Sequence, residues 1–199
     1  LVLATGTCPI LPGIPGEDLE GVFTLKQLPD AVGIKNFIRE SRCRKAIIVG
    51  AGFIGMEMCE AFRKNGIETT VVNRGKMPVP RWDPELGQWV VEALRENQVA
   101  MLSDTTIQAI EKGGDCRLRL LTSQGNFGGD VILLAIGVRP SVGLASEMGL
   151  ALGRTGAISV DLSQRTSHPE VYAVGDCSEA YHRVSKRWTH VPLGDIANK

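Results

Sequence analysis

A glycine-rich turn between two apolar segments constrains the fold of this chain more than any other feature. Residues 45–49 form a short run rich in β-branched side chains, which is typical of a buried parallel strand. Glycines follow at positions 50, 52 and 55, and residues 53–65 carry apolar side chains at helical spacing. Residues 69–72 predict a second strand. Strand, helix and strand within about 30 residues predict a parallel βαβ unit.

This context is what the pattern G-x-G-x-x-G requires before it indicates a dinucleotide site. Gly50 would make the tight turn, Gly52 would let the backbone approach a pyrophosphate, and Gly55 would let helix and strand pack closely. The start of the helix would present unpaired amides and a partial positive charge to the phosphates. The alternative is a glycine-rich turn without a ligand. The complete βαβ unit favours the nucleotide site.

The end of the second strand bears on the choice of coenzyme. Asn73 stands where an acidic residue would bind the ribose hydroxyls of NAD, and it lacks the carboxylate that would repel a 2′-phosphate. Arg74 and Lys76 add positive charge, which favours tolerance of NADP. Arg74 could equally be a solvated turn residue. The choice between NADH and NADPH stays open at this point.

The remaining segments predict a mixed α/β chain with a small antiparallel element. Prolines and glycines in residues 9–29 predict an extended connector, and Asp30 is expected to cap a helix that ends near Glu40. Asp83 and Pro84 predict the start of another helix. The side chains expected on its inward face are Leu86, Trp89, Val90, Ala93 and Leu94. Further strands are expected at 99–102, 106–110, 117–122, 131–137 and 171–174.

Composition excludes several classes of protein. The 22 basic and 22 acidic residues balance, so the charge expected of a dedicated nucleic-acid binder is missing. The apolar runs are shorter than the roughly 20 residues that cross a bilayer, so we expect no membrane segment. Five scattered cysteines without a C-x-x-C or metal-ligand spacing suit a reducing, cytoplasmic compartment and indicate no metal site. The opening Leu1-Val2-Leu3-Ala4-Thr5-Gly6 lacks an initiator Met, and we expect the chain to be a piece of a longer protein.

A series of motifs in order along nearly all 199 residues resembles the pyridine nucleotide–disulfide oxidoreductases. Within that family the branch of coenzyme A disulfide reductases, NADH oxidases and NADH peroxidases is the most similar. The match to the second flavin motif, Val171 to Asp176, is the most specific. The other matching segments are Leu3 to Gly6, Pro15-Gly16 with Gly21 to Leu25, Lys45 to Gly55, Ala135 to Pro140, and Pro192-Leu193-Gly194 with Ala197-Asn198-Lys199.

The resemblance implies a Rossmann-like, three-layer NAD(P)-binding domain at residues 13–140, inserted into a partial FAD domain. Residues 1–12 and 141–199 would be the two remnants of that FAD domain. Asp176 would hydrogen-bond the flavin ribityl chain, Phe53 would cover the flavin face, and Glu57 would lie near the nicotinamide. The other residues expected at the cofactors are Ile54, Gly137, Thr5, Gly6 and Gly175.

Each of these roles has a structural alternative. Asp176 could cap the next helix, Phe53 could simply pack, and Glu57 would favour a helix start through the dipole alone. Cys177 is interpreted as structural, and the histidines are assigned no role. Met56, Met58 and Cys59 are expected in the core.

The family's first flavin fingerprint and redox-active cysteine would precede Leu1, and its dimerisation domain would follow Lys199. We therefore expect no catalytic residue in this chain. In the intact flavoprotein, expected to be a homodimer, NAD(P)H would reduce FAD. The electrons would pass to a thiol, disulfide, peroxide or oxygen acceptor, or to an electron-carrier protein. The alternative function is a regulatory or redox-sensing module that binds NAD(H) without catalysis.

Overall fold

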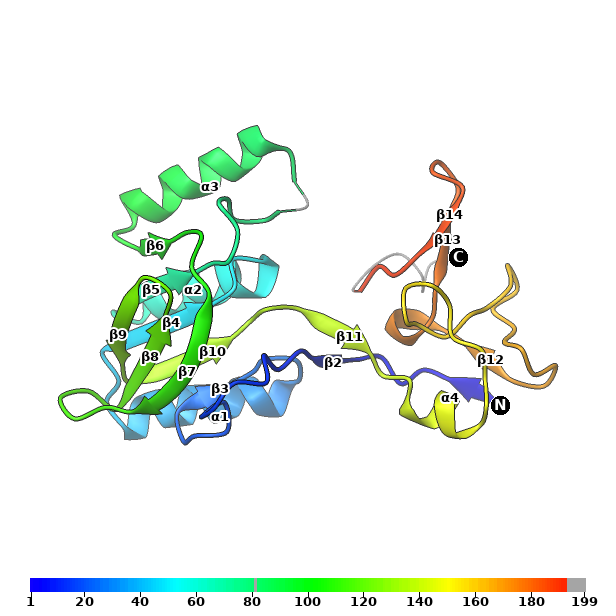
Figure 1. The fold of residues 1–199 in the computed structure, drawn as a ribbon, viewed down its shortest axis with the longest axis horizontal. Coiled ribbons are helices and arrows are strands. Elements are labelled where there is room, and N and C mark those ends of the chain that lie inside the picture. Colours follow the sequence, from blue (N-terminus) through cyan, green and yellow to red (C-terminus); the bar gives the residue numbers. More distant parts are fainter. Residues whose placement is uncertain (81, 193–199) are drawn as a thin grey trace. The chain divides into compact units, whose positions relative to one another are not determined.

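The computed structural model describes residues 1–80 and 82–192 and divides the chain into two compact units (Figure 1). One unit is Pro9–Gly137, and the other combines Leu1–Cys8 with the residues from Val138 onward. The segment predicted as a helix entry at 193–199 lies outside the described residues.

A parallel sheet of five strands forms the centre of the first unit. Its order is β3-β10-β4-β5-β6, and every neighbouring pair is parallel. The strands are β3 (Val22–Phe23), β4 (Lys45–Val49), β5 (Glu68–Val72), β6 (Ala100–Leu102) and β10 (Val131–Leu134). The strands at 45–49 and 69–72 were predicted, whereas β3 lies within the predicted connector and is recruited by pairing with β10.

Both faces of this sheet are covered, because successive side chains of each strand point to opposite faces. Ala46 and Ile48 belong to a core shared with the helices α1 (Leu28–Glu40), α2 (Phe53–Lys64) and α3 (Pro84–Glu96). Ile47 and Val49 belong to a second core, shared with an antiparallel sheet. The layers are therefore helices, parallel sheet and antiparallel sheet, which confirms the predicted fold class.

The antiparallel layer consists of β7 (Ile107–Lys112), β8 (Leu118–Thr122) and β9 (Gly125–Gly129) in that order. Strand β9 was not predicted, because its sequence Gly-Asn-Phe-Gly-Gly has little intrinsic tendency to form a strand. It forms by pairing with β8, where Leu120 stands opposite Phe127.

The start of α1 corrects the predicted cap. Gln27 is the N-cap, and Asp30 occupies the third helical position, where its carboxylate accepts the amides of Lys26 and Gln27 at 2.9 and 2.8 Å. This reciprocal arrangement is a capping box. Pro29 lies in the first turn, where its missing N–H costs nothing.

The packed face of α3 also differs from the prediction. The helix begins after Asp83 as expected, but its buried positions are Gly87 and Leu94, with Val90 packed against the core. Gly87 lets the helix approach Met77, because an added Cβ would lie 3.3 Å from the Met77 Cε. The predicted inward residues that are exposed instead are Leu86, Trp89 and Ala93.

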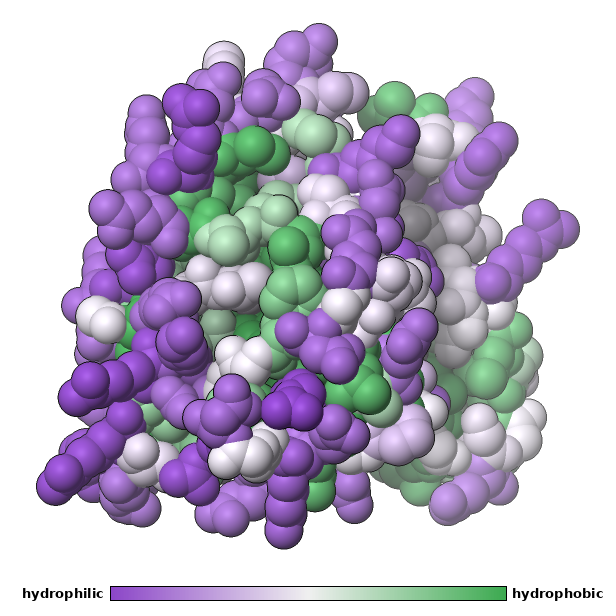
Figure 2. All heavy atoms as spheres, turned by 60° about the vertical axis from the view of Figure 1, so that its left-hand side comes forward, coloured by the Kyte–Doolittle hydropathy of each residue, from purple (hydrophilic) through white to green (hydrophobic). Residues whose placement is uncertain are grey.

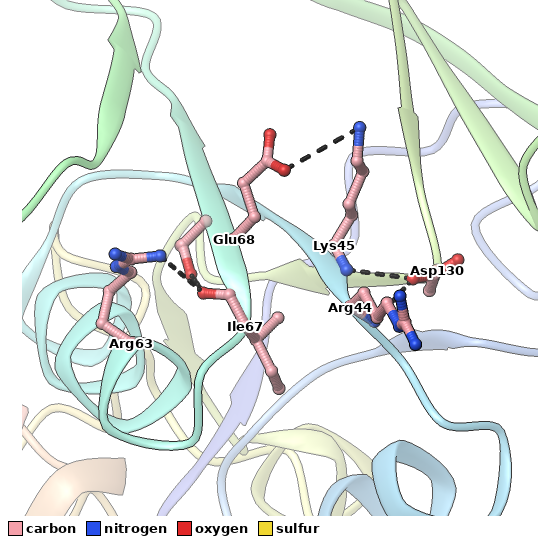
Figure 3. Close-up of polar contacts among 7 residues, drawn as sticks. Arg44, Lys45, Arg63, Ile67, Glu68 and Asp130 are labelled. Carbon is pink, nitrogen blue, oxygen red and sulfur yellow. Dashed lines mark hydrogen bonds and ion pairs between the residues drawn. The ribbon is translucent and has the colours of Figure 1, made fainter.

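Polar contacts tie together the strand starts at one edge of the parallel sheet (Figure 3). The Asp130 carboxylate accepts the backbone amides of Arg44 and Lys45 at 2.7 and 2.9 Å. The Lys45 ammonium lies 3.8 Å from the Glu68 carboxylate. The opposite edge, where the strands end, therefore carries the turns considered for coenzyme binding.

The second unit brings together segments from the two ends of the chain. Strand β1 (Val2–Leu3) pairs in parallel with β12 (Tyr172–Ala173), so that Leu3 stands opposite Ala173. Both residues belong to a core with Ile158 and Cys177. The remaining elements are β2 (Thr7–Pro9), β11 (Val138–Pro140), α4 (Gly143–Glu147), the 3-10 turn η1 (Gly175–Cys177), β13 (Ala180–His182) and β14 (Arg187–Thr189).

None of the helices in the described part of the chain is long and apolar enough to span a membrane. Hydrophilic side chains dominate the rim of the face in Figure 2, and hydrophobic ones gather between them.

Candidate functional site

Gly50 makes the turn that ends β4. Its φ of +105° lies where side chains are strained, and its N–H donates to the Val72 carbonyl at 2.8 Å. An added Cβ would overlap the Ala135 carbonyl oxygen and lie 3.2 Å from the Ile136 Cα. The fold therefore requires glycine here, because the turn lies against the end of β10.

The other two glycines of the pattern differ in their surroundings. An added Cβ at Gly55 would overlap the Gly50 carbonyl oxygen, so Gly55 allows α2 to pack against the turn. Gly52 has a φ of −84°, which other residues adopt, and no atom lies within 4 Å of its added Cβ. Within residues 1–80 and 82–192, no packing contact requires a glycine at position 52. A pyrophosphate close to this backbone would explain it.

The N-terminus of α2 suits an anion. Gly52 is the N-cap, no side chain caps the helix, and the first turn contains no acidic residue. The first amides of a helix lack partners within it and carry the positive end of the dipole. Glycine at 52 and the uncapped amides together fit a dinucleotide pyrophosphate.

Phe53 lies at the start of α2 with 54% of its surface exposed. Its ring contacts Trp82 edge to face, with centroids 5.6 Å apart, and Trp82 is also exposed. Ile54 is half-buried and Glu57 is exposed one turn further along the helix. The simple packing role considered for Phe53 accounts for only part of its surface, since more than half of it faces outward.

Asn73 follows β5 at the same edge of the sheet. Its side-chain oxygen accepts the Ala51 amide at 3.4 Å, and its nitrogen donates to the carbonyls of Gly75 and Met77 at 2.9 and 3.0 Å. The side chain thus joins the glycine turn to the loop after β5. Arg74 is exposed.

Gly137 closes the segment that follows β10. It has a φ of +124°, and its carbonyl accepts the Ile10 amide at 3.0 Å. Strands β10, β4 and β5 are neighbours in the sheet, so Ala135, Gly50 and Asn73 follow three adjacent parallel strands. Ligands of open α/β sheets bind outside the carboxyl ends of such strands.

The residues predicted to contact the flavin are divided between the units: Phe53 lies in the first, and Thr5, Gly6, Gly175 and Asp176 lie in the second. Pairing of β1 with β12 places Thr5 and Gly6 after one strand and Gly175 and Asp176 after its neighbour. The Thr5 hydroxyl donates to the Ser141 carbonyl at 2.6 Å. Residues almost a whole chain apart in sequence are therefore adjacent here.

Two neighbours of Asp176 were not predicted. The Thr7 hydroxyl donates to its carboxylate at 3.4 Å, across 169 residues of sequence. The His190 Nε2 lies 2.7 Å from the Asp176 carbonyl oxygen, and it must carry a proton because a carbonyl can only accept. No local pattern in the sequence marks either residue.

Burial makes the thiols of Cys43 and Cys59 poor nucleophiles. It raises the pKa of Cys59 from 9.0 to about 11, and it also raises the pKa of Cys43. Cys177 is buried and its thiol lies 3.3 Å from the Val174 carbonyl oxygen. Within residues 1–80 and 82–192, no three His, Cys, Asp or Glu side chains are grouped to hold a metal ion.

Comparison with known proteins identifies relatives for the whole described chain. The pyridine nucleotide-disulphide oxidoreductase family matches residues 1–192. An "NAD(P)H sulfur oxidoreductase (CoA-dependent)" of Pyrococcus abyssi is 36% identical over 200 residues, which cover 100% of this chain and 44% of the relative. The chain thus spans less than half the length of this relative.

Solved structures share the fold. The reduced CoADR-RHD of Bacillus anthracis superimposes with a TM-score of 0.93 at 38% identity, covering 100% of this chain and 35% of that one. An engineered water-forming NADPH oxidase, derived from an NADH oxidase of Lactobacillus brevis and bound to NADPH, gives a TM-score of 0.92 at 25% identity. That match covers 99% of this chain and 43% of the oxidase.

Proposed function

Since the chain belongs to the pyridine nucleotide-disulphide oxidoreductase family, we propose that it is the coenzyme-binding part of an FAD-dependent NAD(P)H oxidoreductase. Residues 13–140 bind NAD(P)H. Residues 1–12 and 141–199 supply part of an FAD site. The relatives are more than twice as long as this chain, which leaves room for the rest of that site.

The observation that carries the proposal is the open space at Gly52 beside the uncapped start of α2. The amides of the first helical turn hold the pyrophosphate, and the Gly50 turn keeps them aligned with the strand ends. When bound, NAD(P)H supplies a hydride and FAD accepts it. Phe53, exposed at the start of α2, is the residue we assign to the flavin face, and Glu57 is assigned to the nicotinamide.

The flavin assignment rests on the paired strands β1 and β12. Asp176 contributes a carboxylate for the ribityl hydroxyls; the Thr7 hydroxyl donates to that carboxylate, and the His190 ring donates to the backbone carbonyl of Asp176. At Thr5, Gly6 and Gly175 the backbone would lie close to the flavin. A module that only senses NAD(H) would have no use for this second group of residues, which favours the enzyme.

The names of the relatives indicate which class of electron acceptor the protein uses. Their names include a CoA-dependent sulfur oxidoreductase and a water-forming oxidase, so we propose a small thiol, disulfide or sulfur species, or oxygen, as acceptor. We further propose that the full-length protein is a homodimer and works in the cytoplasm.

The sequence Asn73-Arg74 supports use of NADPH. The engineered NADPH oxidase carries, among its printed substitutions, an aspartate changed to alanine and the next residue changed from alanine to arginine. This chain likewise has no carboxylate at Asn73 and has an arginine directly after it.

The proposal is tested by titrating the chain with NADPH and NADH and following coenzyme fluorescence. We expect the chain to bind both coenzymes and to be purified without stoichiometric FAD, because only part of the FAD site is present. Gly52→Val should lose binding while keeping the thermal stability of the wild type. Gly33→Val is the matched control, since an added Cβ at Gly33 also meets nothing within 4 Å. A folded Gly52→Val variant with wild-type affinity would contradict the site.

A further inference from the structure

The hydrogen bonds of the Asn73 side chain are all made with backbone atoms of the protein. Its oxygen accepts from Ala51, and its nitrogen donates to both Gly75 and Met77. The backbone of Asn73 is also held, because its N–H donates to Leu102 at 2.9 Å and its carbonyl accepts from Thr105 at 3.0 Å. The half-buried amide therefore has both its donors occupied within the loop.

Only an amide can make this set of contacts. The Gly75 and Met77 carbonyls can only accept, and the Ala51 amide can only donate, so the partners fix which end of the side chain is nitrogen. An ionised aspartate has no donor, and one of its oxygens would lie about 3 Å from two carbonyl oxygens. The loop at residues 73–77 thus requires a side-chain amide at position 73. It excludes the carboxylate that would accept a hydrogen bond from a ribose hydroxyl.

We propose that Asn73 is a positioning residue that sets the preference for NADPH by holding the loop that carries Arg74 and Lys76. This inference rests on the proposed function of the same site. Asn73 itself does not read the ribose. It fixes the backbone on both sides of Arg74, through Ala51 in the glycine turn and through Gly75 and Met77 in the loop.

Arg74 and Lys76 are placed to recognise the 2′-phosphate. Both are exposed, and within residues 1–80 and 82–192 neither side chain forms an ion pair. The loop is tied down further along, because the Ser103 hydroxyl donates to the Lys76 carbonyl at 2.9 Å and the Asp104 amide donates to Gly75 at 3.3 Å. Two cations on a fixed loop, with a guanidinium that matches phosphate geometry, suit a phosphomonoester.

The test is a double-mutant cycle on the ratio of the dissociation constants for NADH and NADPH, measured with Asn73→Ala, Arg74→Ala and the double variant. We expect each single variant to lower the preference for NADPH about tenfold, the loss typical of one charge-assisted hydrogen bond. The double variant should lose less than the two single losses combined, because Asn73 acts through the loop that carries Arg74 and Lys76. Asn73→Asp should lose NADPH affinity without gaining affinity for NADH.

Asn65→Ala is the control. The Asn65 side-chain amide donates to the Ala61 backbone carbonyl at 2.8 Å, so the variant removes a contact of the same kind elsewhere in the same unit. It should leave the ratio unchanged. Additive losses in the double variant, an unchanged ratio in Asn73→Ala, or tighter NADH binding in Asn73→Asp would each overturn the inference while leaving the proposed function standing. A folded wild-type chain that binds neither coenzyme would overturn the proposed function itself.

Discussion

Replacing Gly50 by alanine should destabilise the fold, whereas the same change at Gly52 should not. At Gly50 the φ of +105° strains any side chain, at a cost of about 1–3 kcal/mol. The added Cβ would also lie 2.8 Å from the Ala135 carbonyl carbon, and overpacking against backbone costs about 1–3 kcal/mol more. The expected loss in the free energy of unfolding is therefore about 2–6 kcal/mol, or roughly 5–20 °C in Tm for a chain of this size.

At Gly52 the φ of −84° suits alanine, and the added Cβ meets no atom within 4 Å. The change in stability should stay within about 1 kcal/mol. Thermal unfolding followed by circular dichroism gives the Tm of both variants. Coenzyme titration at a temperature well below both Tm values gives their affinities. Gly52→Ala should weaken coenzyme binding without moving Tm. A Gly50→Ala variant as stable as wild type would refute the packing of this turn against β10, and equal destabilisation by both substitutions would refute the distinction between the two glycines.

Three further predictions concern stability. Burial raises the pKa of the Cys59 thiol from 9.0 to about 11, so its stabilising contribution is complete below pH 9 and falls by roughly 2–3 kcal/mol as the pH rises through 11. Cys59→Ala should lack this decline when urea unfolding is followed over that range. Glu179→Ala should cost about 2–4 kcal/mol in urea unfolding, because the buried carboxylate accepts the Thr155 amide and hydroxyl at 3.0 and 2.8 Å, and Glu179→Gln should cost less. Asp30→Ala should cost about 0.5–2 kcal/mol through loss of the capping box, with faster amide hydrogen exchange confined to the start of α1.

The elements that could be predicted from sequence are those whose signal lies in a few adjacent residues. Residues 46–49 and 131–134 are continuous apolar runs within their strands, because both faces of the sheet are buried. The glycine turn and α2 follow directly from the first run. Local pattern and fold agree there, so the βαβ unit needed no information from distant residues.

The features that were missed depend on distant partners. Strand β9 contains three glycines and exists because β8 pairs with it, and β3 exists because β10 provides an edge. The predicted packed face of α3 was right at Val90 and Leu94 but wrong at Trp89. Hydrophobicity favoured Trp89, which is 66% exposed, over Gly87, which is buried. A glycine gives no hydrophobic signal even where close packing selects it.

The coenzyme site shows how a motif residue is assigned to the ligand or to the fold. Gly50 fits the motif, but the fold alone explains it, because Ala135 and Ile136, directly after β10, occupy the space that a side chain would need. Within residues 1–80 and 82–192 Gly52 has no such neighbour, so packing does not require glycine there, whereas a bound pyrophosphate would. For Asn73 the outcome is the reverse. Its place after β5 indicated a contact with the ribose, but its side-chain amide hydrogen-bonds the backbone of Ala51, Gly75 and Met77. Substitutions at Gly52 and Arg74 should therefore report on the ligand directly, and those at Gly50 and Asn73 should report on it only through the backbone that they hold in place.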